Sequence, residues 1–84
     1  MPAGATIPDV DVGERVFLFR DARGWSIVET AKRSGLSREA VGKIEGGKTS
    51  PTLASLRRLS RGFGVSLDEF LHGPVPERET EKQT

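Results

Sequence analysis

The side chains and glycines with the clearest chemical potential lie in SREAVGKIEGGKTSP, residues 37 to 51. From Gly42 onward this segment matches G-x-x-x-x-G-K-S/T, the pattern of a loop that wraps nucleotide phosphates. Such a loop must follow a buried strand and open a long helix, because its glycines hold the phosphates at a helix N-terminus. Here the first glycine lies within a helical apolar pattern, and Pro51 follows soon after the last motif residue. We therefore interpret the match as accidental.

No set of residues in the sequence predicts catalysis. The chain has no cysteine and a single histidine, His72, so it offers neither a thiolate metal site nor a histidine cluster. Serines are numerous, but no general base and orienting group accompany them in a recognisable pattern. We expect a protein that is not an enzyme and that needs neither a metal nor a cofactor.

Positive charge is concentrated in the middle of the chain. The net charge is only +1, yet residues 35 to 64 hold six bases and two acids, whereas residues 65 to 84 hold two bases and five acids. The basic region includes the whole of the segment described above, which favours a polyanionic partner. An ordinary solvated surface is the alternative interpretation of the same charges.

Apolar periodicity, capping residues and glycines predict five helices and no strand. The helices are expected over residues 12–23, 27–34, 38–45, 51–63 and 67–71. Ser26 and Ser66 each stand three residues before a glutamate, the arrangement of a capping box. In the fourth helix, Pro51 is expected in the first turn with Ser50 as the cap. The fold class is therefore all-α.

The organisation expected is one domain with two short appendages. Residues 12–72 carry the helical pattern, residues 1–11 are expected to form a flexible arm, and residues 73–84 a disordered tail of prolines and charges. Eighty-four residues leave no room for a second domain. No apolar run is long enough for a membrane span and no export signal is visible, so a cytoplasmic protein without membrane contact is expected.

Two short helices joined by a tight turn are predicted for SIVETAKRSGLSREAVGKIE, residues 26 to 45. Ala31 is small where the helices must touch, Gly35 lies in the turn, and Val41 and Ile44 hold the second helix down. The second helix is then propped outward, where it can enter a DNA major groove about 12 Å wide. Its outward face comprises Ser37, Arg38, Glu39, Gly42 and Lys43.

From about Val12 to Leu71 the chain resembles the phage-repressor and Cro-like (XRE) helix-turn-helix family of transcription regulators. The motifs that carry the resemblance are VGERV followed by Arg20, TAKRSGLSREAVGKIEGGKTSP, and LASLRRLSRGFGVSLDEFL. The resemblance implies a compact lambda-repressor-like domain that binds double-stranded DNA. Because one short helix reads few base pairs, we expect a homodimer on a palindromic operator.

The resemblance also implies roles for individual residues. The residues implied to reach base edges are Arg38, Glu39 and Lys43. The residues implied to contact phosphates are Ser37, Gly46, Lys48, Thr49 and Ser50. A structural ion pair between the first helix and the end of the recognition helix is implied for Arg20 and Glu45. A dimer seam is implied at Leu67, Phe70 and Leu71.

The chain departs from the family pattern at several positions. Ile27 stands where the family often has a glutamine that braces a phosphate, and Thr30 and Ser34 stand where leucines are usual. Phe17 and Leu18 occupy positions that are often polar, and we expect them to enlarge the core; an exposed patch for a partner is the alternative. The rival functions are an antitoxin or protein-interaction module that keeps the fold, and, more remotely, nucleotide binding.

Overall fold

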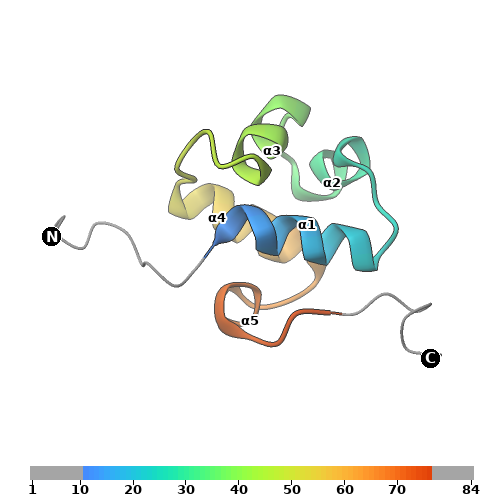
Figure 1. The fold of residues 1–84 in the computed structure, drawn as a ribbon, viewed down its shortest axis with the longest axis vertical. Helices are drawn as coiled ribbons and strands as arrows, with labels where there is room; N and C mark the ends of the chain where they lie inside the picture. The colour runs from blue at the N-terminus through green and yellow to red at the C-terminus, as the bar shows by residue number, and fades with distance from the viewer. Residues whose placement is uncertain (1–10, 77–84) are drawn as a thin grey trace, which may run out of the picture.

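A computed structural model describes residues 11–76 of the chain, and all regular secondary structure within them is helical. The five helices are α1 (Val12–Ala22), α2 (Ile27–Ser34), α3 (Arg38–Glu45), α4 (Leu53–Phe63) and α5 (Leu67–His72) (Figure 1). The all-α, five-helix fold predicted from the sequence is confirmed. The arm and tail expected at the two ends fall mostly on residues 1–10 and 77–84, which lie outside the described residues.

A side-chain cap fixes the start of every described helix. The caps are Asp11, Ser26, Ser37, Thr52 and Ser66, and each accepts a hydrogen bond from the backbone N–H three residues later. These bonds satisfy N–H groups that have no partner within the helix. Four of these caps stand directly before the start predicted for their helix, namely Asp11, Ser26, Ser37 and Ser66.

The start predicted for the fourth helix is wrong by two residues. Ser50 was expected as the cap and Pro51 in the first turn, but α4 begins at Leu53. The Thr52 hydroxyl accepts from the Ser55 N–H at 3.0 Å, so a better-placed cap lies after the proline. Ser50 and Pro51 belong instead to the loop that joins α3 to α4.

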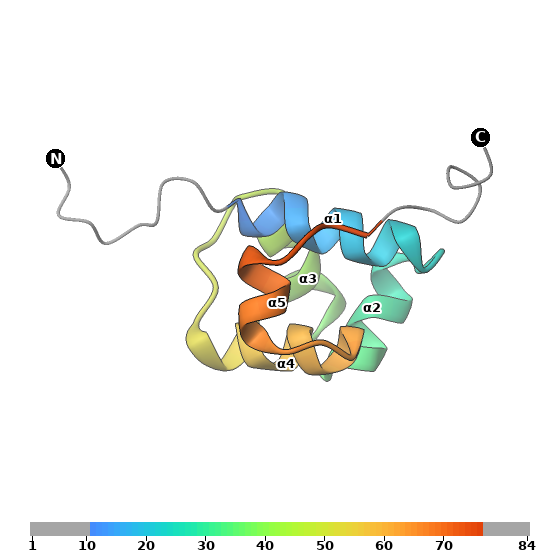
Figure 2. The ribbon, with the colours of Figure 1, turned by 90° about the horizontal axis from the view of Figure 1, so that it is seen from below.

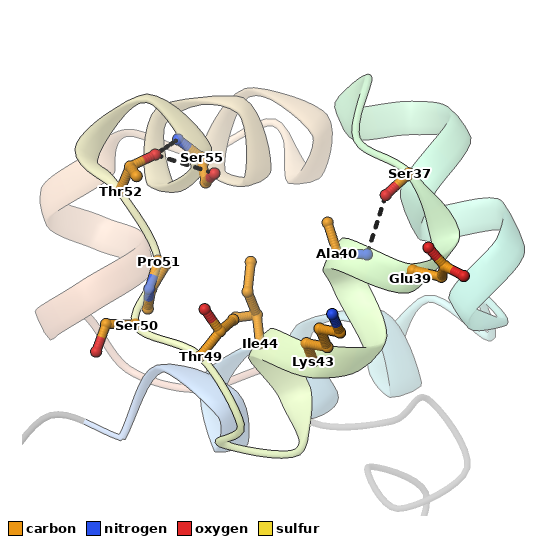
Figure 3. A pocket seen from close by; sticks show the side chains of 10 residues that line it. All are labelled: Ser37, Glu39, Ala40, Lys43, Ile44, Thr49, Ser50, Pro51, Thr52 and Ser55. Carbon is orange, nitrogen blue, oxygen red and sulfur yellow. Dashed lines mark hydrogen bonds between the residues drawn. The ribbon is translucent and has the colours of Figure 1, made fainter.

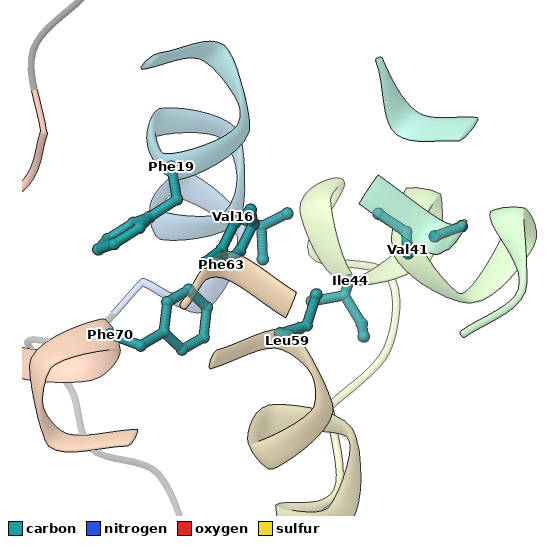
Figure 4. Packing of buried hydrophobic residues seen from close by; sticks show 8 residues of the cluster. Val16, Phe19, Val41, Ile44, Leu59, Phe63 and Phe70 are labelled. Atoms are coloured by element: carbon teal, nitrogen blue, oxygen red, sulfur yellow. The ribbon is translucent and has the colours of Figure 1, made fainter. Parts of the chain in front are cut away.

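All five helices contribute to one core (Figure 4), and Figure 2 shows α5 lying between α1 and α4. The Phe19 and Phe63 rings lie on opposite helices with centroids 5.4 Å apart, and Phe70 of α5 approaches both, at 5.4 and 5.7 Å. Trp25 stacks on Phe63 at 5.8 Å from the edge of this cluster. The remaining buried apolar residues are Val16, Ala31, Val41, Ile44 and Leu59.

Two of the buried residues of α2 are polar. Thr30 and Ser34 occupy family leucine positions, and the structure buries both. Their hydroxyls donate to the carbonyls of Ser26 and Thr30, at 2.9 and 2.8 Å, so each buried oxygen has a partner within its own helix. Ile27 packs against the core, whereas Val28 is exposed. The helix therefore packs through Ile27 and through small residues, and Val28 does not contribute.

Backbone contacts through glycines set the spacing between helices. A Cβ added at Gly13 would lie 2.5 Å from the Glu45 carbonyl oxygen, and one added at Gly62 would lie 3.0 Å from the Arg33 carbonyl oxygen. Distances this short would force backbone atoms to move. The start of α1 therefore lies directly on the end of α3, and α4 lies directly on the end of α2.

Arginines tie helix C-termini to neighbouring elements. Arg15 donates to the carbonyls of Phe70 and Gly73 at the end of α5, and Arg23 donates to the Phe63 carbonyl at 2.7 Å at the end of α4. Cations placed at these carbonyls also complement the helix dipole. Burial lowers the pKa of Arg23 from its ordinary value, but an arginine remains charged in any case.

Candidate nucleic-acid interface

The inward side of α3 is packed and its outward side is exposed. Val41 is fully buried and Ile44 is 3% exposed, so the helix is held against the body of the domain by these two side chains. Arg38, Glu39 and Lys43 all fall on the exposed side. The structure therefore presents the three residues implied for base contacts on one outward surface of one helix.

The N-terminus of α3 is fixed by Ser37. Its hydroxyl oxygen accepts from the Ala40 N–H at 3.0 Å. The hydroxyl proton is still available as a donor, because a serine hydroxyl can accept and donate at the same time. An anion at this end of the helix would also meet unpaired N–H groups and the positive end of the helix dipole. The geometry is therefore compatible with the phosphate contact implied for Ser37.

A groove of about 310 Å³ runs between α3 and the loop leading into α4 (Figure 3). We call it the hydroxyl-lined groove, because five hydroxyl side chains border it together with the charged Glu39 and Lys43. The hydroxyls are those of Ser37, Thr49, Ser50, Thr52 and Ser55. In Figure 3 the Glu39 and Lys43 side chains lie on the α3 side of this groove and Ser50 on the opposite side.

The groove unites some of the expected site residues and omits others. Five of the eight residues implied for DNA contact border it, whereas Arg38, Gly46 and Lys48 are exposed outside its lining. Thr52 and Ser55 were not among the expected residues, although both border the groove. Their T-x-x-S spacing is a capping pattern, and recognising it would have placed them at the start of α4.

The end of α3 is held by a two-point ion pair. Arg20 Nε lies 2.8 Å from Glu45 Oε1, and Arg20 Nη2 lies 2.9 Å from Glu45 Oε2. The hydrogen bonds to Glu45 raise the pKa of Arg20. Arg20 Nη1 also donates to the Trp25 carbonyl at 3.0 Å. One guanidinium thus connects α1, the segment before α2 and the end of α3, and a bidentate pair of this kind fixes orientation as well as distance.

Phe17 is not part of the core. It is 41% exposed, and its ring centroid lies 5.3 Å from the guanidinium carbon of Arg20. The expectation that Phe17 enlarges the core is therefore wrong, because its place on α1 points away from the buried side that carries Val16 and Phe19. Leu18 is partly buried. The Phe17 ring covers one face of the cation that anchors α3.

The expected dimer seam is altered by the burial of one residue. Phe70 is fully buried among Phe19 and Phe63 of its own chain, so it has no surface to offer a second copy. The seam is implied by the family resemblance, which does not show which side of this six-residue helix faces inward. Leu67 and Leu71 are partly buried, and both keep some exposed surface.

Residues 11–76 form neither a cluster of metal ligands nor a membrane-spanning helix. Among these residues, no group of three or more histidine, aspartate or glutamate side chains is arranged to hold a metal ion. No helix in this part of the chain has the length and hydrophobicity needed to cross a membrane.

Comparison with known proteins gives matches that cover the helices described above. A model of the helix-turn-helix family HTH_3 matches residues 18–70. The HTH-type transcriptional regulator PuuR of Escherichia coli (strain K12) is 37% identical over 62 residues, which are 74% of this chain and 34% of PuuR. The prophage-derived HTH-type transcriptional regulator YonR of Bacillus subtilis (strain 168) is 41% identical over 61 residues, which are 73% of this chain and 56% of YonR. The chain thus spans between a third and just over half of these relatives.

A solved structure matches over most of its length. The restriction-modification controller protein C.AhdI of Aeromonas hydrophila superposes with a TM-score of 0.69 at 31% identity. The superposition covers 74% of this chain and 94% of C.AhdI. The similarity therefore extends over nearly all of that smaller protein.

Proposed function

Because the chain belongs to the XRE-type helix-turn-helix family of DNA-binding transcription regulators, we propose that it recognises a specific duplex sequence by placing α3 in the major groove. The observation that carries the proposal is the division of α3 into two sides. Val41 and Ile44 are buried, whereas Arg38, Glu39 and Lys43 are exposed on the other side. A helix held in this way can enter a groove without loss of its own packing.

The three exposed side chains have the chemistry needed to discriminate bases. Arg38 can donate two parallel hydrogen bonds to guanine O6 and N7, and Glu39 can accept from cytosine N4. Lys43 lies on the same side of α3, beside the hydroxyl-lined groove. Each well-made base contact discriminates against a wrong base by about 1–3 kcal/mol.

We assign the phosphate contacts to the groove and the loop that follows α3. Ser37, Thr49 and Ser50 border the hydroxyl-lined groove, and Gly46 and Lys48 are exposed between them along the chain. Hydroxyls, backbone N–H groups and lysines all bind phosphate oxygens without regard to base sequence. Such contacts set the register in which α3 meets the bases.

We further propose that the protein acts as a homodimer on a palindromic operator. Two copies related by a two-fold axis would place two α3 helices about 34 Å apart, one turn of DNA. Leu67 and Leu71 are the seam residues that retain exposed surface. Such a dimer would double the number of base pairs that are read.

Selection of bound duplexes from a random pool tests this proposal. The protein should enrich a palindromic sequence, and its affinity for that duplex should fall by orders of magnitude between 50 and 200 mM salt. Arg38→Ala should relax preference at one base pair of each half-site, whereas Lys48→Ala should weaken enriched and random duplexes alike. If both variants bound both duplexes as the parent does, these residue assignments would be wrong.

One observation favours a second candidate function, a protein-interaction module that keeps the fold. Phe17 is exposed, and a large exposed aromatic side chain is a frequent contact in protein interfaces. Under this alternative the pool would yield no enriched duplex. Binding of a protein partner would also change little with salt and would be lost in Phe17→Ala.

A further inference from the structure

A second groove, more basic than the hydroxyl-lined groove, lies between the end of α2 and one side of α4. Its volume is about 550 Å³. Small groups form part of its lining, namely Ser34, Gly35 and Ala54. The remaining lining residues are all basic, namely Lys32, Arg33, Arg57, Arg58 and Arg61. We call this cavity the basic groove. No carboxylate is among the residues that line it.

The concentration of charge here is out of proportion to the chain as a whole. The net charge of the protein is +1 with thirteen bases, and five of those bases border this one groove. Arg33 is paired with Glu29 at 2.6 Å, which offsets part of its charge. The base-reading surface of α3, by comparison, carries two cations and one carboxylate. The basic groove is therefore the more positive of the two surfaces and favours an anionic occupant.

The basic groove directly adjoins the proposed DNA-binding surface. Gly35 borders the basic groove and Ser37, two residues later, borders the hydroxyl-lined groove. On α4, the consecutive residues Ala54 and Ser55 divide between the two grooves in the same way. Arg58 Nη1 donates to the Gly35 carbonyl at 3.2 Å and so joins the two walls at the boundary. The two grooves are therefore neighbours on α4 and on the turn between α2 and α3, and a polyanion lying on α3 would pass close to the basic groove.

We infer that the basic groove binds the sugar-phosphate backbone of the duplex that α3 reads, outside the base pairs that α3 contacts. The inference rests on the proposed function. Each DNA strand presents a negative charge about every 3.4 Å along the axis, so a duplex seated on α3 brings further phosphates past any adjoining surface. Arginine matches this ligand because its planar fork donates two hydrogen bonds to a phosphate. Contacts of this kind add affinity and salt dependence without adding sequence preference.

The variant Arg57→Gln/Arg61→Gln tests the inference. It leaves the Arg33–Glu29 pair and the Arg58 hydrogen bond in place, and both substituted side chains are exposed, so the fold should be retained. If each arginine neutralises one phosphate, the slope of log K against log salt should become shallower by about 1.8, at roughly 0.9 per contact. Affinity for the enriched duplex and for a random duplex of equal length should fall by the same factor.

Two controls separate the groove from other causes. Arg57→Lys/Arg61→Lys keeps both charges and should retain most of the parent slope. The enriched duplex can also be shortened to the base pairs that α3 contacts. The parent and the glutamine variant should then bind this short duplex with the same affinity and the same salt slope. Because Arg57 and Arg61 also border a hollow that contains Leu67, sedimentation measures the oligomeric state of each variant. A glutamine variant that lost affinity only because it no longer dimerised would overturn the inference.

The remaining outcomes are distinct. An unchanged slope, with the parent still bound to its enriched duplex, would overturn the basic-groove assignment and leave the proposed function standing. Binding of polyglutamate by the parent but not by the glutamine variant, again with an unchanged DNA slope, would instead identify the groove as a site for acidic protein segments. Failure of the parent to enrich any duplex would overturn the proposed function itself, and the inference with it.

Discussion

The two sides of α3 are built under opposite constraints. On the inward side, Val41 and Ile44 are buried, Glu45 is held by Arg20, and Gly13 of α1 lies against the α3 backbone. On the outward side, a Cβ added at Gly42 would meet nothing within 4 Å. The position of α3 is thus set by residues on its inward side alone. The residues proposed to read DNA are ones that the fold itself does not need.

The strongest disruption of this arrangement should come from Gly13→Ala. The new methyl group would lie 2.5 Å from the Glu45 carbonyl oxygen and 2.8 Å from that of Ile44, so α1 and α3 must separate. Overpacking against backbone atoms should cost about 3 kcal/mol of unfolding free energy. Urea denaturation measures this loss. Wild-type stability in the variant would show that the contact between α1 and α3 is not rigid.

The next largest effect should come from Glu45→Gln, which removes the charge that faces Arg20. Both side chains are less than a fifth exposed, so the cost should approach that of breaking a buried pair but remain below it, at about 2 kcal/mol. Chemical denaturation measures the loss. Glu39→Gln is the matched control on the outward side of the same helix, and it should leave stability unchanged. Equal effects of the two substitutions would contradict the contrast between the two sides.

Gly42→Ala should have a smaller effect and the opposite sign. Of the glycines within described helices, Gly13 and Gly62 are explained by close backbone contacts, whereas Gly42 is not. Alanine should therefore stabilise α3 by about 0.5–1 kcal/mol, because it removes the entropy cost of a helical glycine. If the outward side approaches DNA closely, the same methyl group should weaken binding to the enriched duplex. Thermal unfolding and a binding titration on one sample would show whether stability rises as affinity falls.

The smallest effect on stability should come from Arg38→Ala, at most about 0.5 kcal/mol in either direction. Arg38 is exposed, and it lies at the first position of α3 away from the core. A melting curve that matches the parent, combined with altered base preference, would place its role entirely in recognition. A large loss of stability would show that the outward side also supports the fold.

Much of the fold follows from short-range patterns. The caps at Ser26, Ser37 and Ser66 depend on bonds only three residues long, and the apolar positions of each helix repeat at the spacing of its turns. These features require no knowledge of distant segments. The exposed set on α3 followed for the same reason, since the apolar pattern of eight residues already defines its two sides.

Features that depend on contacts between distant segments could not be predicted from such local patterns. The start of α4 was misplaced because two hydroxyl residues stand close to Pro51 and either can cap. Phe17 was expected in the core and is exposed, whereas Phe70 was expected at a dimer seam and is buried. The sequence around an aromatic residue does not show which distant side chains will cover it. The burial of Ser34 accompanies the close approach of Gly62 of α4 to the end of α2, and the hydroxyl of Ser34 then finds its partner within its own helix.

The sequence by itself determined five helices, three of their caps and the outward chemistry of α3, because capping and periodicity act over a few neighbouring residues. Tertiary structure alone decided which aromatic side chains are covered, how α1 and Arg20 fix the end of α3, and that cations from α2 and α4 share one groove. Those outcomes depend on side chains from 20 or more residues away along the chain meeting in space. Helix packing creates such meetings, and no local pattern encodes them.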